Sequence, residues 1–256
     1  MKVLLIAFCA CCALAGAGER ERPLMRDFIG PNVDAKQLIP SSSALRSYPE
    51  DPTTKWLDNL RQLQKSRAGH ARTKELWETE FGYDMSTKPA PSGVETPSVT
   101  EEQQAMWTVR AFLLLAGLGV DRAHLISAKD ANAPQLRSDG SAPNLQPKPV
   151  FHALAWLRRS LGDYRFSHVE REDAGDCFCY EFIHSTDSKK RILAIWKPAG
   201  DPLVVRLFHD PLLVTRAERM PLTHGDAETA TVKLEIEGYF AIQAEERPIL
   251  VWLDEK

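Results

Sequence analysis

Residues 77–84 read Trp77-Glu78-Thr79-Glu80-Phe81-Gly82-Tyr83-Asp84, and this stretch decides the fold that we expect. A short run of strand-forming residues ends in the carboxylate of Glu80, and a glycine follows two positions later. A strand fixes the direction of the acid, and the glycine lets the chain turn away after it. In sheets of parallel strands, functional groups lie at the carboxyl ends of the strands. Glu80 is therefore the first candidate for a functional residue.

The segments around this stretch alternate between strand and helix patterns. Each predicted helix has a start signal: Asp51 before Pro52, a capping box of Thr100 and Gln103, and Pro149. The helices are predicted over 51–69, 100–116 and 148–162, the strands over 74–81 and 120–127, and long loops over 84–99 and 131–146. Strands that alternate with helices predict a parallel sheet.

The pattern changes after Gly162, where short strand-like runs separated by turn residues replace the helices. The runs are 164–169, 177–184, 191–196, 203–208, 231–236, 239–243 and 249–253. Short strands at this spacing predict an antiparallel sandwich, and we expect a domain boundary near Gly162.

Taken together, these segments resemble a known family. Residues 77–84 are similar to the seventh-strand motif of retaining (β/α)8-barrel glycoside hydrolases. The sequel follows in the same order: 103–114 resembles the seventh helix, Gly119-Val120-Asp121-Arg122 the entry to the eighth strand, 148–154 the start of the last helix, and 161–166 the passage into a small β-domain. The resemblance covers roughly 52–256.

This resemblance implies an α/β fold, with a partial (β/α)8 barrel of about the last two or three β/α units and then an all-β antiparallel sandwich. A whole barrel takes about 250 residues. The expected organisation is a signal peptide at 1–17, an irregular segment at 18–50, a partial barrel at 51–162 and a C-terminal β-sandwich at 163–256.

The resemblance also implies a catalytic role for Glu80, which occupies the position of the nucleophile. In a retaining glycosidase a second carboxyl group about 5 Å away protonates the leaving oxygen. In the family that acid usually follows an asparagine, and this sequence contains no Asn-Glu pair. We therefore expect the chain to be inactive alone, although the complete enzyme would hydrolyse O-glycosidic bonds in a polysaccharide or oligosaccharide.

Four further acids and aromatic residues are candidates near this position. Tyr83 and Asp84 could line a sugar subsite, with a role in the turn as the alternative. Asp130, at the end of the next strand, could hydrogen-bond a sugar hydroxyl or cap its loop. Glu78, two residues before Glu80, shares a strand face with it. In a closed barrel an unpaired carboxylate on that face would be costly to bury or would stay protonated, whereas in an open half-barrel it would lie in water.

The composition excludes some partners and favours others. A net charge of −3 over 256 residues argues against nucleic-acid binding. A basic start, an apolar run and small residues near Ala17 predict secretion, with no membrane attachment after cleavage. Carbohydrate is the expected partner, no metal or cofactor is expected, and open sheet edges predict self-association.

The sequence also leaves alternatives for the cysteines, the histidines and the function. Cys177 and Cys179 are two residues apart, so we favour two packed thiols over a strained disulfide or a metal site. The seven histidines show no ligand spacing and are expected to be structural or on the surface. The alternative function is a non-catalytic secreted module that binds carbohydrate or a protein through the β-sandwich.

Overall fold

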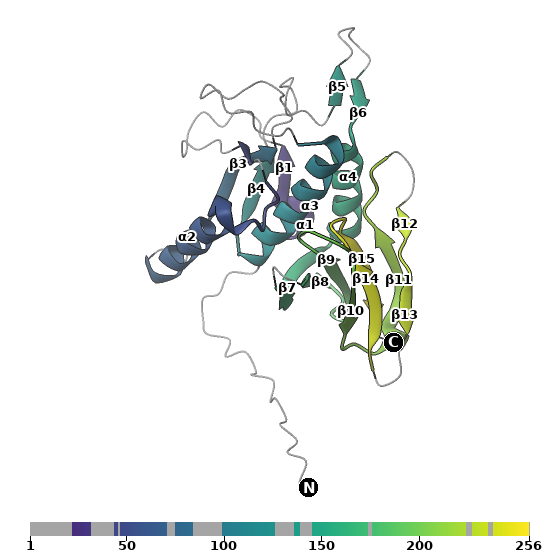
Figure 1. Cartoon of the computed structure of the whole chain (residues 1–256). Coiled ribbons are helices and arrows are strands. Elements are labelled where there is room, and N and C mark those ends of the chain that lie inside the picture. Colours follow the sequence, from purple (N-terminus) through teal and green to yellow (C-terminus); the bar gives the residue numbers. More distant parts are fainter. Residues whose placement is uncertain are drawn as a thin grey trace.

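The computed structural model describes residues 22–31, 44–45, 47–70, 75–83, 99–125, 136–138, 145–173, 176–223, 227–234 and 238–255. The predicted signal peptide, Asp84 and Asp130 lie outside these ranges. Within them, helices lie between a parallel sheet and a larger antiparallel sheet (Figure 1). None of the described helices combines the length and apolar composition that crossing a membrane requires.

A four-stranded parallel sheet forms the first layer, as the alternating pattern predicts. Its strands lie in the order β1-β4-β3-β2, and every pair is parallel. Their bounds are β1 (Ile29–Pro31), β2 (Ala44–Leu45), β3 (Trp77–Tyr83) and β4 (Arg122–Leu125). Helix α1 (Met25–Phe28) leads directly into β1.

Helix α2 (Trp56–His70) begins later than its predicted start. Asp51 instead caps a short 3-10 turn, η1 (Pro52–Thr54), and Lys55 then takes a left-handed conformation with φ 56°. The helix also runs through Gly69, which was predicted to end it, and Leu63 is exposed. A proline after an acidic cap therefore marked the turn that precedes the helix.

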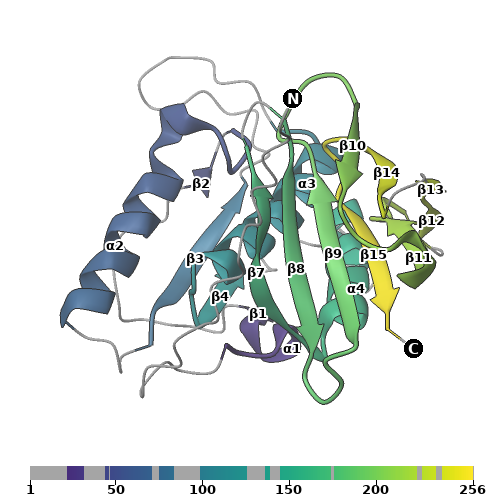
Figure 2. The same ribbon diagram turned by 90° about the horizontal axis from the view of Figure 1, so that it is seen from below.

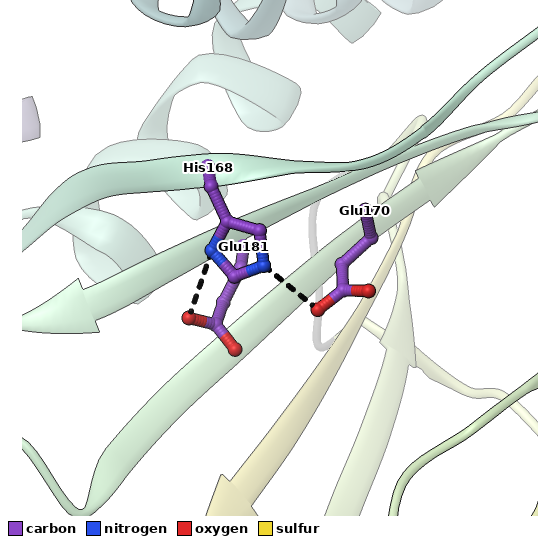
Figure 3. A group of neighbouring side chains, drawn as sticks. All are labelled: His168, Glu170 and Glu181. Atoms are coloured by element: carbon purple, nitrogen blue, oxygen red, sulfur yellow. Dashed lines mark hydrogen bonds and ion pairs between the residues drawn. The ribbon is translucent and has the colours of Figure 1, made fainter. Parts of the chain in front are cut away.

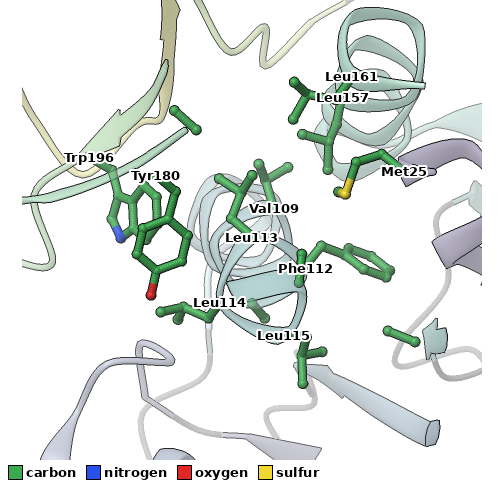
Figure 4. Packing of buried hydrophobic residues seen from close by; sticks show 14 of the residues in the cluster. Met25, Val109, Phe112, Leu113, Leu114, Leu115, Leu157, Leu161, Tyr180 and Trp196 are labelled. Atoms are coloured by element: carbon green, nitrogen blue, oxygen red, sulfur yellow. The ribbon is translucent and has the colours of Figure 1, made fainter. Parts of the chain in front are cut away.

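The helical layer consists mainly of α3 (Glu101–Gly117) and α4 (Pro149–Leu161). The predicted capping box at the start of α3 is present, with Thr100 and Gln103 bonded reciprocally. α3 is buried on nearly all sides, as expected for a helix with sheets on opposite faces. Phe112 packs on Phe81 of the parallel sheet, and Figure 4 shows Tyr180 and Trp196 approaching α3 from the other direction.

Two antiparallel sheets follow the helices. The six-stranded sheet has the order β12-β11-β15-β9-β8-β7, and the three-stranded sheet the order β10-β14-β13. The first contains β7 (Tyr164–Glu172), β8 (Phe178–His184), β9 (Lys190–Trp196), β11 (Val214–Arg219), β12 (Glu228–Thr229) and β15 (Ile249–Asp254). The second contains β10 (Leu203–Leu207), β13 (Val232–Leu234) and β14 (Phe240–Ala244), and a 3-10 turn η2 (Pro211–Leu213) follows β10.

The central strands of the six-stranded sheet are buried on both faces. Phe178, Tyr180 and Phe182 of β8 belong to the core that the helices share. Cys179 lies on the opposite face and belongs to a second core, which includes Phe240 of the three-stranded sheet. Figure 2 shows β7, β8, β9 and β15 side by side, with α3 and α4 behind them. The six-stranded sheet therefore separates two hydrophobic cores.

Several strand predictions need correction. The segment 18–50 was expected to be irregular, but it contains α1 and the strands β1 and β2 of the parallel sheet. β11 was missed because only Ala217 is fully buried along it, so its sequence lacks the alternation of a half-buried strand. The two-residue strand β12 was missed with it. The stretch 131–146, predicted as a loop, contains the hairpin of β5 (Leu136–Ser138) and β6 (Leu145–Pro147).

Candidate functional site

Strand β3 carries the acids that the sequence singles out, and its pairing with β4 is irregular. Glu78 pairs with Ala123, whereas Phe81 pairs with Leu125. Three steps along β3 thus correspond to two along β4, so β3 contains one extra residue between Glu78 and Phe81. The expected shared face of Glu78 and Glu80 assumed regular alternation, which this shift interrupts.

Glu80 lies inside this irregular segment. β3 continues past it to Tyr83, so the strand does not end at Phe81 as predicted. Bulges are common beside active sites because they re-aim one side chain relative to its neighbours. Glu80 is one of the two residues of β3 that lie between the paired positions Glu78 and Phe81.

Burial also affects Glu78, the acid at the second position of β3. It lies opposite the fully buried Ala123 and is itself largely covered. Burial raises the pKa of Glu78 to about 7, because its charged form loses the solvation of water. A carboxyl group with such a pKa can give up or take a proton at neutral pH. The raised pKa of Glu78 reflects the cost of burying a carboxylate at this position.

Tyr83 occupies a different environment from the predicted sugar subsite. Its side chain is 1% exposed, and its ring packs edge-on against Trp107 at a centroid distance of 5.5 Å. Its hydroxyl oxygen has no hydrogen-bond partner among the described residues, and burial raises its pKa well above the ordinary value. Because the ring lies in the helical core, we do not retain Tyr83 as a sugar contact.

The exposed tryptophan of the parallel sheet is Trp77, at the amino end of β3. The guanidinium of Arg122 lies over its ring, 5.4 Å from the centroid, and the His124 ring is 6.0 Å away. An exposed indole can stack on a sugar ring, but active sites of parallel barrels lie at the opposite ends of the strands. Trp77 therefore lies at the less favourable end for catalysis.

A buried charge network, which sequence reasoning missed, lies on α3. Arg110 donates from Nε to Glu50 Oε1 over 3.0 Å and from Nη2 to Glu50 Oε2. Arg110 also donates to the carbonyl oxygen of Pro198, and Trp196 Nε1 donates to Glu50 Oε1 over 2.6 Å. The signal was a single cation inside the apolar run 109–115. The network joins α3 to the end of β9.

A hollow of about 200 Å³ adjoins this network. Its lining carries both signs of charge, including Glu50, Asp58, Arg61 and Glu172. Of these residues, Glu172 accepts a hydrogen bond from the hydroxyl of Tyr180 over 3.1 Å. Neither Glu78 nor Tyr83 lines this hollow.

Comparison with known proteins shows the fold and not the family. No protein-family model matches the chain, and no curated protein matches it. Three solved structures illustrate the likeness. A family 39 glycoside hydrolase from the gut symbiont Bacteroides cellulosilyticus WH2 is 16% identical, with 77% of this chain and 38% of that chain covered and a TM-score of 0.57.

The other two are similar in extent. A bifunctional glucanase-xylanase from a metagenome library is 9% identical, with 90% and 41% covered and a TM-score of 0.53. A family 30 subfamily 8 xylanase from Clostridium acetobutylicum is 10% identical, with 83% and 46% covered and a TM-score of 0.51. The chain spans about two fifths of the length of these enzymes. The chain therefore has a glycoside hydrolase-like fold.

Proposed function

We propose that this chain is a secreted glycoside hydrolase-like protein that contributes the nucleophile of a retaining enzyme and is inactive alone. The observation that carries the proposal is the glycoside hydrolase-like fold, together with a carboxylate in the irregular segment of β3. In this proposal the partial barrel of 51–162 contains β3, β4, α3 and α4, and the preceding segment adds β1 and β2 to its parallel sheet. The two antiparallel sheets are the β-sandwich of 163–256.

The proposed chemistry assigns one step to Glu80. A carboxylate oxygen of Glu80 attacks the anomeric carbon, and the bond to the leaving oxygen breaks as that oxygen takes a proton from a second carboxyl group. Water then hydrolyses the glycosyl ester. Glu78 is a poor candidate for the second acid, because two acids on one strand cannot flank a sugar from opposite faces. The second acid comes from a segment that completes the barrel.

The test is hydrolysis by an assembly in which a complete barrel includes this chain. Glu80→Gln should abolish hydrolysis of aryl glycosides, whereas Glu78→Gln should retain most of it. A fluorosugar that traps the glycosyl ester should label the peptide that contains Glu80. Hydrolysis that survives Glu80→Gln would refute the assignment of the nucleophile.

A second candidate function is carbohydrate binding without catalysis, which the exposed end of the three-stranded sheet favours. Phe208, just after β10, is 72% exposed, and its ring contacts Tyr239 at a centroid distance of 4.9 Å. The apolar side chains of Val204 and Leu212 are also exposed nearby in the chain. Exposed aromatic rings provide apolar surface for the faces of sugars.

A panel of glycans presented to the whole chain tests this second candidate. Phe208→Ala should weaken binding, and Phe151→Ala, at another exposed phenylalanine, is the matched control. Absence of binding across a broad panel would exclude the carbohydrate version. Self-association through open edges of the parallel sheet is a related proposal, and sedimentation that shows a tight monomer would contradict it.

A further inference from the structure

The edge strand β7 carries a cluster of groups that can bind a metal ion. His168 and Glu170 lie on β7, and Glu181 lies on the neighbouring strand β8. One ligand atom from each lies within 4.8 Å of the other two. Figure 3 shows the His168 ring between the two carboxylates, with Nε2 3.0 Å from Glu170 Oε1 and Nδ1 3.5 Å from Glu181 Oε1.

Two irregularities in β7 bring these side chains together. The register with β8 shifts between Phe166 and His168 and again between Val169 and Arg171. Each shift inserts one extra residue into β7, and the second leaves Glu170 without a partner residue on β8. His168 remains directly opposite Glu181. Without the second bulge, Glu170 would take a regular place in the ladder.

A second histidine approaches the cluster from the other sheet. His209 follows β10 by two residues, and its side chain is 10% exposed. Its Nε2 lies 3.5 Å from Glu170 Oε1, yet this buried nitrogen has no hydrogen bond of good geometry among the described residues. This contact with Glu170 brings a fourth candidate ligand atom to the cluster.

The two carboxylates are suited to hold a positive charge. Glu170 Oε1 faces His168 Nε2 at 3.0 Å and His209 Nε2 at 3.5 Å. Glu181 is buried, and Arg191 engages its Oε2 over 3.2 Å, which leaves Oε1 facing His168. The Ser167 hydroxyl oxygen also lies 3.0 Å from His168 Nδ1. The ligand atoms of His168, Glu170 and Glu181 thus lie within 4.8 Å of one another, and His209 Nε2 lies beside Glu170.

We propose that His168, Glu170, Glu181 and His209 form a binding site for a divalent transition metal of the zinc class. Imidazole with carboxylate is a donor set that zinc accepts, whereas magnesium and calcium prefer oxygen alone. Two ligands of a tetrahedral zinc ion lie about 3.4 Å apart. The contacts of 3.0 and 3.5 Å with Glu170 are already near that length, and the ligand atoms of His168, Glu170 and Glu181, which lie within 4.8 Å of one another, would draw closer around the ion.

This site would join the two antiparallel sheets at their edges. β7 is the edge strand of the six-stranded sheet, and β10 is the edge strand of the three-stranded sheet. A metal held by ligands from both would fix the separation of these edges and would cover β7 against pairing with another chain. The role is structural and lies beyond the proposed glycosidase chemistry.

The experiment measures metal binding by the whole chain after treatment with a chelator and dialysis. Calorimetric titration with zinc should give one ion per chain, and zinc but not magnesium should raise the midpoint of thermal unfolding. Glu170→Gln and His209→Gln should each weaken zinc binding by about tenfold or more. His184→Gln, at a histidine elsewhere on β8, is the matched control and should bind zinc as the unmodified chain does.

Cobalt(II) provides a readout that does not depend on a variant that folds. The unmodified chain should give the visible absorption of a tetrahedral site without a thiolate charge-transfer band. A thiolate band would place the metal on cysteine and overturn the proposal. Absence of stoichiometric binding, or equal zinc affinity in His209→Gln and the unmodified chain, would also overturn it.

Discussion

Arg110 and Glu50 are 60 positions apart in the sequence and form a two-pronged ion pair that is almost completely shielded from solvent. Trp196 and the carbonyl of Pro198 bind the same pair, so three separate segments meet at one charge. Removing one partner would leave the other charge buried without compensation.

We expect Arg110→Met to lower the free energy of unfolding by about 3–5 kcal/mol. The double variant Arg110→Met with Glu50→Met should recover part of this loss, because no unpaired charge remains. Urea unfolding measures both. Asp163→Asn is the control, since its ion pair with Arg26 is exposed and should contribute about 1 kcal/mol or less. Equal losses for the buried and exposed pairs would contradict this reasoning.

Glu78 should make stability depend on pH. Its pKa in the folded chain is about 7, above the ordinary value of 4.5, so the folded state holds its proton more tightly than the unfolded state. Stability therefore falls as pH rises from about 4.5 to about 7, by an amount on the order of 3 kcal/mol.

The variant Glu78→Gln removes this effect. It should match the unmodified chain near pH 4.5 and be more stable at pH 8, as measured by urea unfolding at both values. The exposed Glu102, changed to Gln, controls for the loss of one carboxylate. A difference between Glu78→Gln and the unmodified chain that is constant with pH would argue against a raised pKa.

Two glycines in helices should respond in opposite directions to alanine. A Cβ atom at Gly117 would lie 2.6 Å from the ring of Tyr180, which is buried against Trp196. Gly117→Ala should cost about 1–3 kcal/mol through overpacking. Nothing lies within 4 Å of the same atom at Gly69, so Gly69→Ala should stabilise α2 by about 0.5–1 kcal/mol. Thermal unfolding of both variants decides the signs.

Cys177 and Cys179 are free and buried thiols, as the sequence favoured. Burial raises the pKa of both, well above the ordinary value for Cys179, and reactivity requires the thiolate. Iodoacetamide at neutral pH should therefore modify neither cysteine until urea unfolds the chain. Peptide mass analysis would reveal this, and rapid modification of Cys179 in the folded chain would disagree with its burial.

Local signals in the sequence were sufficient to predict features that depend on one helix or strand alone. The reciprocal bonds of Thr100 and Gln103 depend on four consecutive residues, and the helix after Pro149 depends on a start signal and a stripe. The bulge between Glu78 and Phe81 could not be predicted, because it is a relation between two strands. Regular alternation was the only assumption available to a reading of β3 alone.

The candidate sites show the same division. Glu80 could be proposed from its own strand alone, whereas the pairing of Arg110 with Glu50 required the packing of α3 against a distant segment. The histidines were expected to be structural because they have no ligand spacing along the chain. His168 and His209 approach the same carboxylate only because the edges of two sheets meet.

The double burial of the six-stranded sheet has a consequence for any shortening of the chain. A break at Gly162 would pass between the segments of the sequence but not between their cores, since Phe178, Tyr180 and Phe182 need the helices that precede it. The piece that begins at Gly162 would expose a continuous aromatic face to water. The piece that ends there would lose the six-stranded sheet on which α3 packs. The two portions of the chain should therefore be encoded and expressed together, and they should unfold as one unit.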